Sequence, residues 1–201
     1  GRLAGVGTLG DLIAAAHPGI VEQELFGTTD PAAIASVLAS LVTEATGQGA
    51  AAGLWYRSSV AAVAGVHLDG GGAVAVHAYP GTVTPGFLDG VVRVQHHLAD
   101  AGFPCPRPVS GPVRAGAILG LVESLWPDPG MRAFAPREMA ASADGLERFV
   151  SLAAAVDPAG LDAHPMAVPA TALYPRPHSP VFDFEATAEG AEWIDAIATA
   201  A

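Results

Sequence analysis

The chain has 201 residues, of which 51% are hydrophobic and 14% are charged, so it can bury a core and is not a generic disordered chain. Its formal net charge of −11 argues against a nucleic-acid groove or an anionic membrane surface as its partner. All 9 basic residues are arginines, which excludes chemistry that needs a lysine, and Cys105 as the one cysteine excludes an internal disulfide or a cysteine-based zinc site.

The first fifty residues are predicted to be helical. The run from Leu9 to Ala16 is amphipathic and ends before Pro18-Gly19. Thr29-Asp30-Pro31 is typical of a helix start, with a capping side chain and a proline at the first helical position, and it opens the run 32–46. The N-terminal stretch carries an early Asp11 and no apolar core of a signal peptide, and no apolar run reaches membrane-spanning length. We therefore expect a cytoplasmic protein with no membrane partner.

From Gly53 the pattern changes to that of strands. The runs 54–68 and 73–79 alternate in the manner of β-structure, and Asp69-Gly70-Gly71-Gly72 between them predicts a hairpin turn. The later predicted elements are a helix over 85–101 ended by Gly102, strands over 112–114 and 118–125, a helix over 136–156, a proline-rich loop over 157–180 and an amphipathic helix over 187–201.

The glycine run also matches a loose dinucleotide-binding pattern, because Gly70, Gly72 and Ala75 fit G-x-G-x-x-A. That motif must open a helix, so that the pyrophosphate meets the helix N-terminus. Here an alternating run follows and meets Pro80-Gly81, so the pattern favours a hairpin turn that binds nothing.

The order of these elements resembles the small lobe of the aminoglycoside phosphotransferase family, the kinase-like enzymes that phosphorylate small molecules. The most specific piece is VQHHLADAGFPCPRPV at 94–109, which fits the family's L-x-x-x-G-x-P-x-P-x-P helix exit. The resemblance covers roughly 54–125, and weaker similarity extends to 146–161 and to 178–197. It implies an α+β fold: a kinase-like small lobe with an antiparallel sheet and a helix, preceded by helices and followed by the first helices of a large lobe.

The resemblance implies three parts: a helical segment over 1–50, a nucleotide lobe over 51–126, and a hinge exit with the start of the large lobe over 127–201. It implies ATP or GTP with Mg as cofactor and a small-molecule substrate. The family's catalytic loop, a histidine-glycine-aspartate with a later asparagine, is absent. We therefore expect no catalytic and no metal residue here, an inactive isolated chain, and a C-terminal remainder or a companion chain as partner.

The resemblance also implies the candidate binding residues. His77 stands where the family has its phosphate-binding lysine, and Val91, or Asp89 after a shift of two, stands where the family has the glutamate that holds it. The alternative is a strand histidine without a ligand. The remaining candidates are Ser58 and Ser59, in the position of the nucleotide loop or as ordinary turn serines, and Glu123, Ser124 and Leu125, whose backbone would face adenine.

Three other patterns each have a functional and a purely structural interpretation. Asp183-Phe184-Glu185 resembles a metal-binding D-F-G and His178-Ser179-Pro180 resembles H-x-D in its first letter, but neither stands in the required order, and packing of Phe182 and Phe184 is favoured. His96 and His97 face different directions on a helix, which predicts surface residues.

Three hypotheses remain open: the N-terminal portion of such a kinase, a degenerate kinase-like module that binds a ligand or partner without catalysis, and an unrelated α+β domain. Under the first, helices beyond residue 136 should expose apolar side chains to the missing part. The expected set is Leu146, Phe149, Val150, Leu152, Trp193, Ile194 and Ile197.

Overall fold

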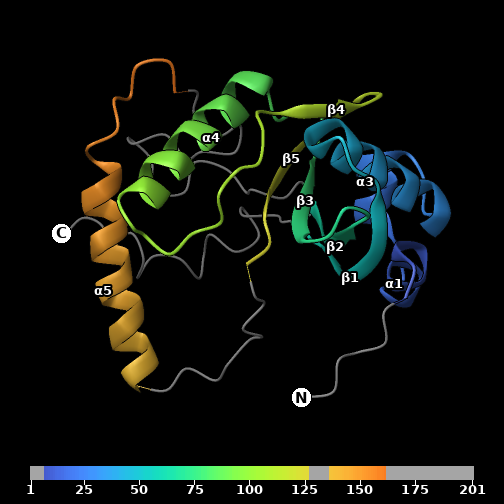
Figure 1. Cartoon of the computed structure of the whole chain (residues 1–201), viewed down its shortest axis with the longest axis horizontal. Coiled ribbons are helices and arrows are strands. Elements are labelled where there is room, and N and C mark those ends of the chain that lie inside the picture. Colours follow the sequence, from blue (N-terminus) through green and yellow to red (C-terminus); the bar gives the residue numbers. More distant parts are fainter. Residues whose placement is uncertain (1–6, 127–135, 162–201) are drawn as a thin grey trace, which may run out of the picture. The chain divides into compact units, whose positions relative to one another are not determined.

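The computed structural model describes residues 7–126 and 136–161, which belong to one unit spanning Gly1–Asp162 (Figure 1). The elements in chain order are α1 (Leu9–Ala15), α2 (Ile20–Phe26), α3 (Pro31–Thr46), β1 (Ala50–Ser58), β2 (Ala62–Leu68), β3 (Ala73–Tyr79), α4 (Pro85–Asp100), β4 (Val113–Ala115), β5 (Ile118–Ser124) and α5 (Pro136–Ala153). The mixed α+β class that the sequence predicted is confirmed.

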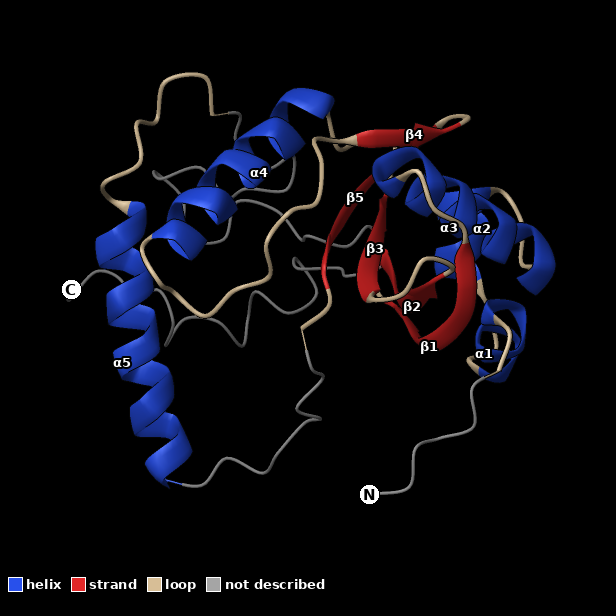
Figure 2. Ribbon diagram, in the orientation of Figure 1, coloured by secondary structure: helices blue, strands red, loops and turns tan. Residues whose placement is uncertain are grey.

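The strands form one open antiparallel sheet of five strands in the order β1-β2-β3-β5-β4 (Figure 2). The chain leaves the sheet after β3, forms α4, and returns to add β4 and β5. As a result β5 lies beside β3, with His77 opposite Leu121 and Ala75 opposite Glu123. This register brings side chains that are 46 positions apart in the sequence onto neighbouring strands.

The glycine run is the turn of the β2–β3 hairpin, as predicted. Leu68 N donates to Gly72 O at 3.1 Å, and Gly71 N donates to Leu68 O at 3.0 Å. Gly71 and Gly72 have φ angles of 91° and 85°, a left-handed conformation that glycine adopts without a steric cost. The residues that follow form β3, so no helix starts at this run.

The N-terminal helices cover one face of the sheet. α3 contacts β3, β4 and β5, and α1 contacts β1 and α3. Asp30 caps α3 as predicted, since its carboxylate accepts from Ala32 N and Ala33 N at 3.3 and 3.2 Å. The short helix α2 lies within the first fifty residues that were predicted to be helical, but its bounds were not predicted. The main core lies between this layer and the inward side chains of the strands, among them Ile34, Leu38, Val66, Val74, Val76 and Val122.

The opposite face of the sheet packs against α4. Because strand side chains alternate between faces, His77 and Tyr79 point away from the core that holds Val74 and Val76. A second, smaller apolar cluster joins this face to α4; its members are Val83, Leu88 and Leu119, with Tyr79, Phe87 and Val91 packed against them.

The helix α5 contacts α4 and the loop that follows it. Arg148 donates to Gly102 O at 2.9 Å, and His97 Nε2 lies 3.1 Å from Leu152 O. His96 and His97 are both half-buried, so the prediction of two surface histidines holds only in part. His97 contacts the Leu152 carbonyl of α5, whereas the contact of His96 with Arg107 is exposed.

The predicted exposed apolar side chains are confirmed on α5 for three residues: Leu146, Phe149 and Val150 are 62%, 38% and 56% exposed. Leu152 is instead half-buried, because it lies on the side of α5 that meets His97. Trp193, Ile194 and Ile197, the predicted helix over 187–201 and the patterns at 178–185 lie outside the described residues. Nowhere in the described part is a single helix long and apolar enough to cross a membrane, although α2 and α3 taken together across a 50° bend pass the same test by length and composition.

Candidate functional site

A buried ion pair joins the two central strands on the α4 side of the sheet. His77 Nε2 lies 2.9 Å from Glu123 Oε1, and the two side chains are 23% and 8% exposed. Glu123 is directly opposite Ala75, two residues from His77 on the same face of β3, so the contact is a diagonal cross-strand pair. Burying a carboxylate is costly unless it is paired and hydrogen-bonded, which marks this pair as a specific feature of the fold.

The helix α4 supplies the second partner of the carboxylate. Gln95 Nε2 donates to Glu123 Oε2 at 2.9 Å, so both carboxylate oxygens are hydrogen-bonded. The orientation of the amide follows from chemistry, because a carboxylate only accepts and the amide nitrogen must therefore face it. Gln95 Oε1 is buried and has no hydrogen-bond partner among the described residues.

The electrostatics of the pair favour an ionised glutamate. Burial by itself would raise the pKa of Glu123, but the hydrogen bond and charge of His77 and the hydrogen bond from Gln95 outweigh it, and the pKa is lowered. Tyr79 stacks on His77 with ring centroids 6.0 Å apart. Burial, together with the nearby Glu123 carboxylate, raises the pKa of Tyr79 to about 12, so this hydroxyl stays neutral.

The segment 107–109 lies beside β5, and its residue Arg107 hydrogen-bonds the backbone N–H and the side chain of Ser124. Ser124 N donates to Arg107 O at 2.7 Å, and Arg107 N donates to Ser124 Oγ at 2.8 Å. Val109 N donates to Val122 O at 2.8 Å in the same ladder. The side chain and the N–H of Ser124 are therefore used within the chain, and Leu125 follows the end of β5 and is half-buried.

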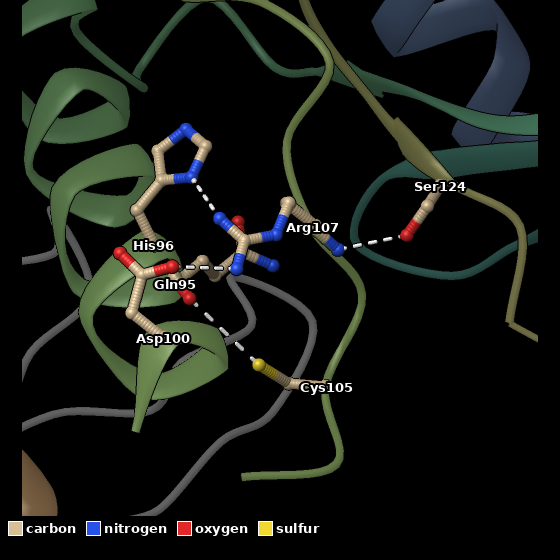
Figure 3. Close-up of polar contacts among 6 residues, drawn as sticks. All are labelled: Gln95, His96, Asp100, Cys105, Arg107 and Ser124. Carbon is tan, nitrogen blue, oxygen red and sulfur yellow. Dashed lines mark hydrogen bonds and ion pairs between the residues drawn. The ribbon is translucent and has the colours of Figure 1, made fainter. Parts of the chain in front are cut away.

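Figure 3 shows how this segment is tied to the end of α4. Arg107 donates to Asp100 Oδ1 at 2.6 Å, and its guanidinium lies 3.3 Å from His96 Nδ1. The hydrogen bond and charge of Arg107 lower the pKa of Asp100. Cys105 Sγ lies 3.8 Å from the carbonyl oxygen of Gln95, and burial raises the pKa of its thiol. These contacts fix the turn of α4 that carries Gln95.

The two predicted loop serines do not join His77. Ser58 is the last residue of β1, and its side chain hydrogen-bonds Glu22, which also accepts from Tyr56 Oη at 2.9 Å. Tyr56 belongs to the core under the N-terminal helices, so Ser58 serves the face opposite to His77. Ser59 is in the turn, where its N–H donates to Ala61 O at 3.0 Å.

The residues considered for the helix glutamate also lie apart from His77. Val91 packs in the apolar cluster with Leu88 and Leu119, and Asp89 is exposed. Gln95, one turn beyond Val91 on the same side of α4, is the helix residue that reaches the pair, and the sequence interpretation missed it. The spacing of four residues was the available signal.

The described residues contain no group of three or more His, Cys, Asp or Glu side chains arranged to hold a metal ion. The arrangement instead offers a half-buried histidine that is hydrogen-bonded to a buried carboxylate and lies beside an aromatic ring. No family model matches the chain, and neither a curated protein nor a solved structure does.

Proposed function

We propose that residues 51–126 are the nucleotide-binding lobe of a small-molecule kinase of the aminoglycoside phosphotransferase type. The complete enzyme transfers phosphate from ATP or GTP, with Mg, to a hydroxyl group of its substrate. The observation that carries the proposal is the placement of His77. It lies on the central strand of the sheet, on the face that α4 covers, where the family has a lysine for the nucleotide phosphates.

The order of the elements supports this proposal. Three strands, a helix and two strands fold into one antiparallel sheet with α4 against one face, as the resemblance implies for a small lobe. Phosphoryl transfer requires charge neutralisation and positioning more than covalent chemistry from the protein. His77 is the basic side chain that β3 presents on this face, and Arg57 is a second one, two strands away on β1.

The same face offers an apolar surface beside His77. Gly65 and Ala75 are opposite one another on β2 and β3, in the alternation that also contains His77. Trp55 lies over Gly65, where an added Cβ would be 2.5 Å from the indole nitrogen, so the ring occupies the space that only glycine leaves. Gly65 and Ala75 are themselves buried, so the half-buried Trp55 ring is the apolar surface here that suits the flat face of a purine base.

Calorimetric titration of the 201-residue chain with Mg·ATP and Mg·GTP at pH 6 and pH 8 tests the proposal. We expect weak binding that is stronger at pH 6, because His77 replaces a permanently charged lysine. His77→Ala should weaken binding at pH 6 by about tenfold, the size of one lost charge-assisted hydrogen bond. His67→Ala is the matched control, since His67 is an exposed strand histidine at the hairpin end. Equal binding by His77→Ala and the unaltered chain would contradict the proposal.

A second candidate is a degenerate kinase-like module that binds a ligand or partner without catalysis. It is favoured by the Glu123 carboxylate, which is 2.9 Å from His77 and places negative charge where phosphates would approach. It is also favoured by Val91 and Asp89, which do not supply a helix acid to His77. Under this alternative neither the unaltered chain nor His77→Lys binds Mg·ATP at either pH.

A further inference from the structure

The helix–strand ion pair that the resemblance implies is rebuilt in this chain from different residues. The strand cation is a histidine, its acid comes from β5 as Glu123, and α4 contributes the neutral amide of Gln95. The helix therefore contacts the acid rather than the cation. This chain of contacts, His77–Glu123–Gln95, spans β3, β5 and α4.

The hydrogen bonds determine which ring nitrogen of His77 holds a proton. A carboxylate can only accept, so the close contact with Glu123 requires a hydrogen on Nε2. In the neutral ring Nδ1 then carries a lone pair, and a further proton can only be added there. Among the described residues Nδ1 has no hydrogen-bond partner, and the His77 side chain is 23% exposed.

The carboxylate itself has little freedom. Both of its oxygens are hydrogen-bonded, its side chain is 8% exposed, and its strand is paired with β3 and bridged to Pro108. A partner fixed in this way orients the imidazole ring, in the manner of a group that holds a catalytic histidine in one tautomer.

We propose that Glu123 is a positioning residue that fixes one hydrogen of His77 on Nε2, so that a second proton can be carried only by Nδ1, the ring atom that faces the nucleotide phosphates, and that Gln95 ties this arrangement to α4. This inference rests on the proposed function. It assigns to Glu123 the role that the family gives to a helix glutamate, and it names the ring atom that meets the phosphates.

Two further titratable groups interact electrostatically with the charge of Glu123. These are the hydroxyl of Tyr79, on the same strand as His77, and the thiol of Cys105, in the segment beside β5; the pKa of each is raised. Both are neutral near pH 7, so Glu123 is the charged group in direct contact with His77 among the described residues. Arg57 lies on the same face in the same cross-strand row, two strands away on β1.

The first test uses the chain without nucleotide. Long-range ¹H–¹⁵N spectra of the histidine rings at pH 8, assigned with His77→Ala, report which nitrogen is protonated. We expect Nε2–H for His77 in the unaltered chain and a mixture of tautomers in Glu123→Leu. An Nδ1–H form in the unaltered chain would overturn the proposal whether or not nucleotide binds.

The second test measures Mg·ATP binding from pH 5.5 to pH 8.5. Glu123→Gln keeps the shape but removes the charge-assisted hydrogen bond to His77, so we expect binding at pH 7 to fall by about tenfold. Gln95→Leu should weaken binding by a smaller factor. His77→Lys combined with Glu123→Gln should restore binding and make it independent of pH, since the lysine carries its own charge; a purely structural role of Glu123 would leave this double variant as weak as Glu123→Gln.

The outcomes separate the two claims. If the unaltered chain binds Mg·ATP and Glu123→Gln binds it equally well at every pH, the role of Glu123 is overturned and the proposed function stands. If the unaltered chain and His77→Lys both fail to bind, the proposed function is overturned, and the role of Glu123 in phosphate binding falls with it.

Discussion

The two faces of the sheet each hold one buried glutamate, and the two glutamates have different partners. Glu22, on α2 in the helical layer over one face, is 3% exposed and accepts from Gly19 N at 2.8 Å and from Tyr56 Oη at 2.9 Å. Glu123, under α4, is 6% exposed and pairs with His77. Both carboxyl groups have a lowered pKa although burial opposes it.

The partners of the two glutamates differ in their chemistry and in their exposure to solvent. The partners of Glu22 are a backbone N–H at the start of α2 and hydroxyl groups, which remain neutral at physiological pH. Burial and the hydrogen bond to Glu22 raise the pKa of Tyr56 further. The partner of Glu123 is a histidine whose side chain is 23% exposed. We therefore expect Glu22 to act as a stabilising contact, whereas Glu123 is the glutamate that we propose to serve ligand binding.

Replacing Glu22 should have the largest effect on stability. Glu22→Ala removes the cap of α2 and leaves the Tyr56 hydroxyl buried without its acceptor, so we expect a loss of about 3 kcal/mol in the free energy of unfolding. Urea unfolding measures this loss, and Glu24→Ala on the exposed side of α2 is the control. A loss of Mg·ATP affinity in a folded Glu22→Ala variant would break the distinction between the two faces.

Lowering the pH should remove the stabilising contribution of both glutamates together. A carboxyl whose pKa is lowered on folding contributes stability that is present above its unfolded pKa, near 4.5 here, and that is lost as the pH falls through the folded value. We therefore expect the free energy of unfolding to decrease below pH 4.5. Urea unfolding at a series of pH values from 6 to 3 measures this, and the double variant Glu22→Gln with Glu123→Gln should show a flatter dependence.

The β2–β3 hairpin turn belongs to neither face of the sheet. A substitution there should lower the free energy of unfolding by less. Gly72→Ala places a side chain at a φ of 85°, which we expect to destabilise the chain by about 1 kcal/mol. Gly81→Ala, where the φ is not positive and an added Cβ meets nothing within 4 Å, is the matched control. Thermal unfolding measures both, and nucleotide binding should be unchanged. Phosphate protection of these glycines would revive a binding role for the run.

The smallest effect is expected at Ser124. Ser124→Ala removes the acceptor of Arg107 N, an exposed contact, and should cost about 0.5–1 kcal/mol in the free energy of unfolding. Mg·ATP affinity should stay the same, because the N–H and the hydroxyl of Ser124 are both hydrogen-bonded to Arg107. A clear loss of affinity would show that the Ser124 hydroxyl itself contacts the ligand and that the site extends along β5.

Local features of the fold could be predicted from the sequence. The Asp30-Pro31 helix start, the Asp69–Gly72 turn and the helix after Pro85 are each encoded by neighbouring residues, and all three are present. The bounds of the seven-residue helix α2 were not predicted because it is too short to show a clear period.

The candidate site depends on contacts between distant residues, and the sequence could indicate only part of it. His77 was singled out by its place in a strand, but its partner Glu123 was considered for its backbone alone. Gln95, 28 residues before Glu123, was not considered, although it lies one helical turn beyond Val91. The direction of the Ser58 side chain, toward Glu22, likewise depends on the packing of α2 against the sheet.

The segment that runs beside β5 also decides how the sheet meets other molecules. β4 pairs with Ile118–Gly120, and residues 107–109 bond to Val122 and Ser124, so the outer edge of β5 is covered along its length. Exposed strand edges invite pairing with other chains, and prolines block such pairing because they lack an N–H. Pro104, Pro106 and Pro108 therefore make this covering segment a poor template for strand addition. As a result, intermolecular β-sheet formation is disfavoured beside the strand that carries Glu123.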